Sequence, residues 1–181
     1  EDRDEFRGGL ETIVLGEWGP WDFRSGANRP PRQKPGGLLA DCVWDAEWFQ
    51  WDLESSDPRT FEGAWRQRAA TPEVSARVST FTNPWSSDDV RRAVGTEFFG
   101  LIASTTFQCN RSGTATYALT VNSDDGVRVL VDGELVLEDW TLHAPRREEQ
   151  LLELGSGEHS LRLEYFQIQG AAALSVDVSP R

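Results

Sequence analysis

Two adjacent carboxylates stand out in a short polar stretch of the sequence. Residues 122–126 read Asn-Ser-Asp-Asp-Gly, and an alternating apolar run follows them as far as a second turn at Asp132-Gly133. Asn, Ser, Asp and Gly all favour turns, and one carboxylate is enough to shape such a turn. The second carboxylate leaves two interpretations open. Asp124 and Asp125 either only reverse the chain or hold a ligand.

No recognisable catalytic motif accompanies this pair. The chain has no Gly-X-Ser-X-Gly, no His-Glu-X-X-His and no phosphate-binding loop. Its 30 acidic residues guarantee some carboxylate pairs, so their number alone does not indicate a glycosidase. Cys42 and Cys109 lack zinc-site spacing, and we expect them to form a disulfide if the protein is exported. We therefore predict that the chain is not an enzyme.

The charge balance narrows the range of partners. The formal net charge is −12, whereas binding to nucleic-acid phosphates or to an anionic membrane requires clustered Lys and Arg. The sequence contains no run of 18 apolar residues, so no membrane-spanning helix is predicted. We expect neutral or cationic partners, with neither nucleic acid nor a membrane among them.

The elements that position these residues are mostly strands. From Ala93 onward, apolar and polar residues alternate with period two over short segments separated by Asp-Gly, Gly-Ser-Gly and Gln-Gly. The alternating apolar residues are Tyr117, Leu119, Val121, Val127, Val129, Val131, Leu135, Leu137, Leu152, Leu154, Leu161, Leu163, Tyr165, Leu174, Val176 and Val178. This pattern predicts an antiparallel β-sandwich or barrel. His159, between two of these segments, is expected to close a hairpin.

Two short helices are predicted before these strands. One begins at Asp57-Pro58, carries Phe61 and Trp65 on one face, and ends before the next proline. The second follows Ser-Ser-Asp-Asp at residues 86–89, a sequence that suits a helix cap better than a second carboxylate site.

The region before the helices is less clear. Trp44, Trp48 and Trp51 recur at helical spacing, yet the β-branched and aromatic content also suits a strand, so both remain open. Residues 1–36 contain a stretch rich in Arg, Pro and Gly, which is typical of an arm or linker. We therefore place the folded domain at residues 37–181.

Several motifs together resemble the PA14 domain family. They are the Ser-Asp-Asp-Gly turn, the Val-Asp-Gly hairpin, the Asp-Trp-Thr-Leu-His segment and the closing Leu-Gly-Ser-Gly-Glu-His-Ser-Leu-Arg-Leu-Glu-Tyr-Phe with its Gly-Ala tail. Their order and spacing fit the family from about Glu97 to Val178. The resemblance implies a mainly β, barrel-like antiparallel sandwich, here with one or two short helices. It also implies an exported, non-catalytic module of the kind found in glycosidases, adhesins and toxins.

The resemblance gives the paired aspartates a role. In sugar-binding members of the family, such a pair is joined by a cis peptide and chelates Ca²⁺, which then binds vicinal hydroxyls of a terminal sugar. Calcium takes about six to eight oxygen ligands, so further oxygens are needed. The resemblance places them in the loop Gln169-Gly170-Ala171, as an amide oxygen of Gln169 and main-chain carbonyls of Gly170 and Ala171. Other members of the family have no known ligand.

Two tryptophans are candidates for stacking on the sugar ring. Trp140 lies near the expected metal in sequence, and Trp85 lies in the loop Phe-Thr-Asn-Pro-Trp-Ser-Ser. An indole can cover the apolar face of a sugar. For Trp140 we favour internal packing, with His143 bonded to the main chain, so Trp85 is the better candidate.

We therefore expect a calcium-dependent carbohydrate-binding module, secreted or at the cell surface. It would belong to a larger carbohydrate-active or adhesive protein, and its partners would be a glycan or polysaccharide and the remainder of that parent chain. The alternative is an interdomain or protein–protein interaction module of the same fold that binds no sugar.

Overall fold

The structure, a computed structural model, describes residues 37–50, 60, 62–79 and 87–181. The strands are β1 (Trp44–Gln50), β2 (Val74–Val78), β3 (Phe99–Cys109), β4 (Ala115–Asp124), β5 (Val127–Val131), β6 (Glu134–Asp139), β7 (Arg146–Leu154), β8 (Gly157–Gln167) and β9 (Ala173–Pro180). The helices are α1 (Glu62–Ala69) and α2 (Asp88–Val94). The expected arm at 1–36, the helix start at Asp57-Pro58, and Trp51, Phe61 and Trp85 lie outside the described residues.

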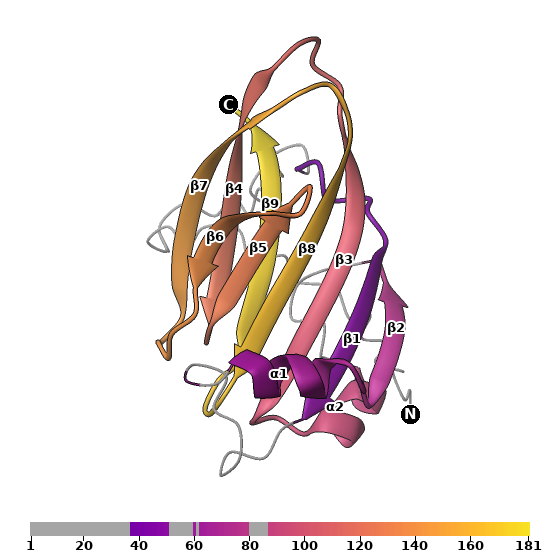
Figure 1. The fold of residues 1–181 in the computed structure, drawn as a ribbon, viewed down its shortest axis with the longest axis vertical. Helices are drawn as coiled ribbons and strands as arrows, with labels where there is room; N and C mark the ends of the chain where they lie inside the picture. The colour runs from indigo at the N-terminus through magenta and orange to yellow at the C-terminus, as the bar shows by residue number, and fades with distance from the viewer. Residues whose placement is uncertain (1–36, 51–59, 61, 80–86) are drawn as a thin grey trace, which may run out of the picture. The chain divides into compact units, whose positions relative to one another are not determined.

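The strands form two antiparallel sheets that enclose the main core. The larger sheet has the order β2-β1-β3-β8-β5-β6, and the smaller has the order β7-β4-β9 (Figure 1). Alternate residues of the central strands point into the space between the sheets, as the period-two pattern predicted. Tyr117, Leu119 and Val121 of β4 and Leu161, Leu163 and Tyr165 of β8 are all buried there. The predicted mainly β antiparallel fold is confirmed.

The ambiguous tryptophan segment is a strand. Trp44, Ala46 and Trp48 are buried in the main core, while Phe49 packs on the opposite face of the sheet. A spacing of four residues keeps two side chains on one face of a helix and also on one face of a strand. The main-chain hydrogen bonds distinguish the strand from the helix, because β1 pairs with both β2 and β3.

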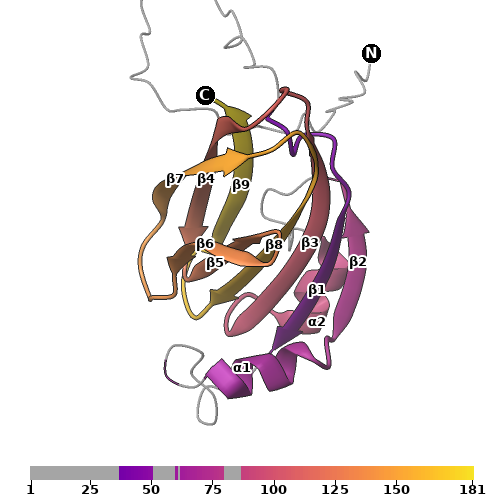
Figure 2. The same cartoon turned by 45° about the horizontal axis from the view of Figure 1, so that its top comes forward.

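A second, smaller apolar cluster lies on the outer face of the larger sheet. Trp65 of α1 packs there against Phe49, with ring centroids 5.2 Å apart, and near Ile102 and Phe166. In Figures 1 and 2, α1 lies at the end of the sandwich where β8 terminates. The helix therefore covers outward-facing side chains of β1, β3 and β8, which helps to explain why the C-terminal half of β8 is buried on both faces.

The predicted cap of the second helix is confirmed. The Oγ of Ser87 accepts a hydrogen bond from the N–H of Val90 at 3.4 Å, and Asp88 and Asp89 follow in the first turn. Carboxylates at this end of a helix interact favourably with its dipole. No described helix is long and apolar enough to cross a membrane.

The expected disulfide between Cys42 and Cys109 is wrong, because both thiols are free. The Sγ of Cys42 lies 3.3 Å from the carbonyl oxygen of Thr106 in β3. Cys109 follows three residues further along the same strand, a distance of roughly 10 Å at about 3.3 Å per residue. A disulfide needs Cα atoms within about 7 Å of each other. The position of Cys42 beside β3 therefore keeps the two thiols apart.

His159 links two hairpins. Its Nδ1 lies 2.6 Å from Oδ2 of Asp132 in the β5–β6 turn, and its Nε2 lies 3.0 Å from the carbonyl oxygen of Gly155 in the β7–β8 turn. Two acceptors require protons on both ring nitrogens, which is the imidazolium form. The hydrogen bond from His159 lowers the pKa of Asp132, and the same bond raises the pKa of His159. The prediction that His159 closes a hairpin is confirmed.

Gly126, directly after the paired aspartates, allows the ring of Phe166 to approach the chain closely. The N–H of Phe166 donates to the carbonyl oxygen of Gly126 at 2.9 Å. A Cβ at position 126 would lie 2.1 Å from Cε1 of that ring. The ring of Trp140 lies against Phe166, with centroids 4.8 Å apart, so Phe166 has little room to move.

We expect His159→Gln to lower the free energy of unfolding by roughly 1 kcal/mol, because half of the Asp132 side chain is exposed and the pair is screened. The contribution of His159 to stability is complete below the ordinary histidine pKa of about 6.5, and it is lost as pH rises through the raised pKa of the folded protein. The contribution of Asp132 to stability is present above the ordinary aspartate pKa of about 3.9, and it is lost as pH falls through the lowered pKa of the folded protein. Urea unfolding across this range should therefore show the largest difference between about pH 4 and 6.5. A difference that does not vary with pH would contradict the ion pair.

We expect Gly126→Ala to destabilise the domain by roughly 1–3 kcal/mol, because the new methyl group overlaps Phe166. Gly155→Ala is the matched control, since a Cβ there meets no atom within 4 Å. Thermal melts of both variants test the packing. Similar midpoints for the two variants would show that the ring can move aside.

Candidate functional site

Three connections between strands meet at one end of the sandwich (Figure 1). Asp124 ends β4 and Asp125 begins the β4–β5 connection, the β6–β7 connection spans residues 140–145, and the β8–β9 connection spans residues 168–172. The β4–β9 register places Asp124 opposite Ala173 at the start of β9. Antiparallel pairing thus brings together segments that are distant in sequence.

Asp125 is hydrogen-bonded to both other connections. Its Oδ1 accepts from the main-chain N–H of His143 at 3.2 Å, and its Oδ2 accepts from the N–H of Ile168 at 2.9 Å. These two bonds fix the orientation of the carboxylate. They also place the start of the loop 169–171 directly beside the aspartate bend, where the resemblance expects its oxygens.

The two aspartates form a buried, negatively charged bend. The peptide bond between them is cis, as the resemblance implied, and Asp124 and Asp125 are 7% and 1% exposed. Burial raises the pKa of Asp124, and the neighbouring Asp125 carboxylate raises it further, while His143 opposes the shift. Two carboxylates in such a position favour binding of a cation, which would relieve their repulsion.

A buried side-chain network continues from the bend. The hydroxyl of Tyr165 donates to the carbonyl oxygen of Asp124 and lies 2.8 Å from Oε1 of Gln167. The Nε2 of Gln167 donates to the carbonyl oxygen of Gln169 at 2.9 Å. A phenol has one proton, so it cannot satisfy both neighbouring oxygens at once. The Tyr165 hydroxyl therefore lies between two acceptor oxygens, one from the bend and one from Gln167.

The oxygen atoms at this end suit Ca²⁺ by type. Asp124 and Asp125 offer carboxylates, and the exposed residues Gln169–Ala171 offer an amide and carbonyls. The buried hydroxyl of Ser123, just before the bend, has no hydrogen-bond partner within the described part of the chain. The described residues contain no group of three or more His, Cys, Asp or Glu side chains that could hold a metal. Main-chain and amide oxygens would therefore have to complete the ligand set, and the residues present fit that requirement.

Trp140 lies in the connection next to the bend, and its ring is engaged in packing. Its ring centroid lies 4.8 Å from that of Phe166 and 5.2 Å from that of Trp65, both edge to face. The guanidinium of Arg128 lies 4.2 Å over the ring. The Nδ1 of His143 lies 2.8 Å from the carbonyl oxygen of Ala144. These contacts agree with the packing interpretation of Trp140 and leave little of the ring for a ligand.

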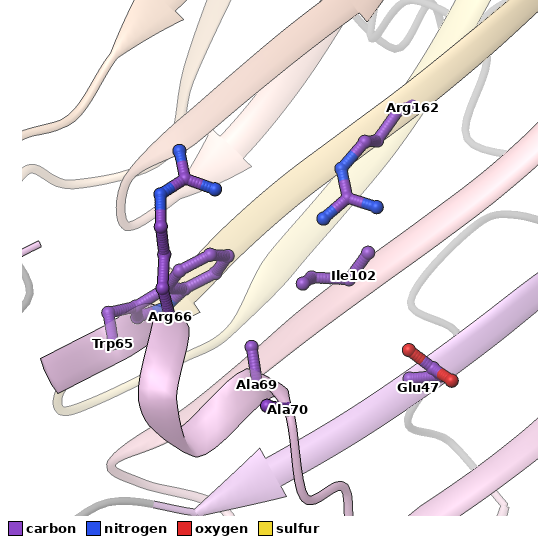
Figure 3. Close-up of a pocket in the computed structure, with 7 residues that line it drawn as sticks. All are labelled: Glu47, Trp65, Arg66, Ala69, Ala70, Ile102 and Arg162. Atoms are coloured by element: carbon purple, nitrogen blue, oxygen red, sulfur yellow. The ribbon is translucent and has the colours of Figure 1, made fainter. Parts of the chain in front are cut away.

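A shallow depression of about 230 Å³ lies away from the bend, between α1 and the outer face of the larger sheet. Figure 3 shows Arg66 projecting from α1 and Arg162 from β8. Both guanidinium groups contact the buried carboxylate of Glu164, at 3.5 and 3.2 Å. Their charge is thus partly balanced within the protein, so the depression offers little excess charge to an anionic ligand. We therefore place the candidate site at the bend.

The roles of Ile168 and Gln167 were not predicted from the sequence. The contact of Ile168 is made by its main-chain N–H, which no side-chain pattern reveals. Gln167 did leave a signal, because it continues the inward-facing series Leu161, Leu163 and Tyr165 with a polar residue. A buried amide at such a position needs hydrogen-bond partners.

Solved structures share this fold. The chain is similar to a β-glucosidase from Kluyveromyces marxianus, with 12% identity and a TM-score of 0.59 over 82% of this chain and 19% of that chain. It is also similar to a PA14 sugar-binding domain from an RTX adhesin, with 16% identity and a TM-score of 0.50 over 78% of this chain and 90% of that chain. A third similar structure is a subtype-switched epithelial adhesin A domain from Candida glabrata in complex with β-lactose. Its identity is 13% and its TM-score is 0.52, over 81% of this chain and 86% of that chain. At these identities the likeness shows the fold alone.

Sequence comparison identifies the family. No curated protein matches the chain. The model of the PA14 domain matches residues 61–181, which include both helices, the bend, the buried network and all strands except β1. The chain spans only a small part of the β-glucosidase to which it is similar, 19%. The earlier resemblance is confirmed, and the chain belongs to the PA14 domain family.

Proposed function

We propose that this domain is a calcium-dependent carbohydrate-binding module. The observation that carries the proposal is the buried pair Asp124 and Asp125, at which the N–H groups of two other connections orient one carboxylate. Two adjacent carboxylates are costly to bury even when one of them is hydrogen-bonded, and a divalent cation would offset that cost.

The chain's own residues would bind and orient the ion. Asp124 and Asp125 would contribute the negative charge, and Gln169, Gly170 and Ala171 would contribute neutral oxygens from the exposed loop. When bound, Ca²⁺ supplies coordination positions for two neighbouring hydroxyls of a sugar. A single sugar buries little surface, so we expect weak binding at each site, with avidity supplied by the parent protein.

Two similar structures support the sugar part of the proposal. One is described as a sugar-binding domain of an adhesin, and the other is an adhesin domain in complex with β-lactose. PA14 domains are typically non-catalytic binding modules. We infer that this module belongs to a larger secreted or cell-surface protein with a carbohydrate-active or adhesive role.

Residues at the rim of the bend would contact the sugar. Leu142 is 53% exposed and immediately precedes His143, whose N–H contacts Asp125. An exposed leucine at this place suits the apolar face of a sugar ring. Trp85 remains our stacking candidate, whereas Trp140 would support the site mainly by packing.

We expect 1 mM CaCl₂ to raise the melting temperature of the wild type by several degrees relative to EDTA, because binding to the folded state alone stabilises it. Asp124→Asn should abolish the shift, since it removes half of the site's charge. Asp45→Asn, which removes a carboxylate that is 76% exposed on β1, should retain it. An unchanged midpoint for the wild type at low salt would contradict the calcium proposal.

We expect a glycan array in CaCl₂ to show binding by the wild type, none by Asp125→Ala, and weakened binding by Leu142→Ser. The leucine variant should keep the calcium-dependent melting shift, because it changes the rim and not the ion ligands. Binding that survives Asp125→Ala would place the sugar site elsewhere. No binding to any glycan would favour the interdomain interaction module.

A further inference from the structure

The buried side chain of Gln167 has contacts that core packing alone does not require. Gln167 and Tyr165 are both 0% exposed, on the inward face of β8. An unbroken chain of polar contacts runs from the Asp124 carbonyl through the Tyr165 hydroxyl and the Gln167 amide to the Gln169 carbonyl. This chain joins the aspartate bend to the loop 169–171.

We propose that Gln167 is a positioning residue for this site. Its amide holds the loop 169–171 at a fixed place relative to the bend, so that the oxygens of both connections are arranged before a cation arrives. The inference rests on the proposed function, because it assigns a role toward the same site.

The loop needs such a restraint. Residues 169–171 are exposed, and Gly170 has φ +88°, a conformation that glycine adopts readily and other residues rarely do. Calcium requires several oxygens at defined distances. A loop that had to become ordered on binding would lower the affinity, whereas a loop that is already ordered avoids that loss.

Two hydrogen bonds restrain the loop in different ways. The bond from the Ile168 N–H to Asp125 holds the entry of the loop. The bond from Gln167 Nε2 holds the carbonyl of Gln169, one residue further. Core packing at position 167 requires no polar group, whereas a buried amide is favourable only when it is bonded. The side-chain amide of Gln167 therefore contacts the network of the bend and the loop, and it takes no part in the pairing of β8 with β3.

The test is Gln167→Met, which keeps a long, flexible side chain and removes the amide. By calorimetric titration with CaCl₂, we expect at least a tenfold weaker affinity than the wild type, the effect typical of residues that orient metal ligands. In calcium-free protein, the backbone order parameters from ¹⁵N NMR relaxation should fall at Gln169, Gly170 and Ala171, because the loop loses its restraint. Tyr165→Phe, which keeps the ring, should weaken calcium binding in the same direction and replaces Gln167→Met if that variant does not fold.

The control separates positioning from general loss of stability. Val129→Ala removes buried core volume in β5, at a residue without polar contacts to the bend or the loop. It should lower the melting temperature, leave the calcium affinity within about twofold, and leave the order parameters of the loop unchanged.

The outcomes distinguish this inference from the proposed function. If the wild type binds calcium and Gln167→Met binds it equally well, the positioning role is overturned while the calcium site stands. If the wild type binds no calcium, the proposed function fails, and the order parameters of the loop still decide whether Gln167 restrains it. Lower order parameters confined to the loop in Gln167→Met would support the positioning role, and unchanged order parameters would overturn it.

Discussion

The carboxylate of Asp125 ties together three connections of the sandwich. It belongs to the β4–β5 bend, and it accepts one main-chain N–H from the β6–β7 connection and one from the β8–β9 connection. Hydrogen bonds to a charged acceptor are stronger than those between neutral groups, and leaving their partners unpaired in a buried place is costly. The conformations of His143 and Ile168, and of the loops that contain them, therefore depend on a carboxylate at this position.

Strand β8 supports the bend from both of its faces. On the inward face, the Tyr165 hydroxyl contacts the carbonyl of Asp124, and Gln167 continues to the loop. On the outward face, Phe166 closes over Gly126 and is held in turn by Trp140. Side chains that alternate along a strand normally serve two separate surfaces. Here the bend crosses the end of the sheet, so consecutive residues of β8 act on the same feature.

Much of the fold follows from local patterns, and the rest depends on pairing between distant segments. Period two predicted the strands from β4 onward, and Ser87 with the acidic residues after it predicted the α2 cap. The spacing of Trp44 and Trp48 could not separate helix from strand, because residues four apart share a face in both. The disulfide prediction was wrong because the place of Cys42 beside β3 depends on how distant segments pair, which local patterns do not reveal. The contacts of Gln167 join it to one main-chain carbonyl and one tyrosine hydroxyl, which single-sequence patterns do not encode.

The charge of the site bears on which ligand it would accept. The two aspartates carry two negative charges at most, and one Ca²⁺ would balance them, so the loaded bend would be close to neutral. A neutral centre on a protein of net charge −12 does not attract anions. The arginines of the depression beside α1 do not change this, since Glu164 lies between them. Neutral sugar hydroxyls, which can replace water on calcium without adding charge, therefore fit the proposed site better than phosphate or a charged polysaccharide.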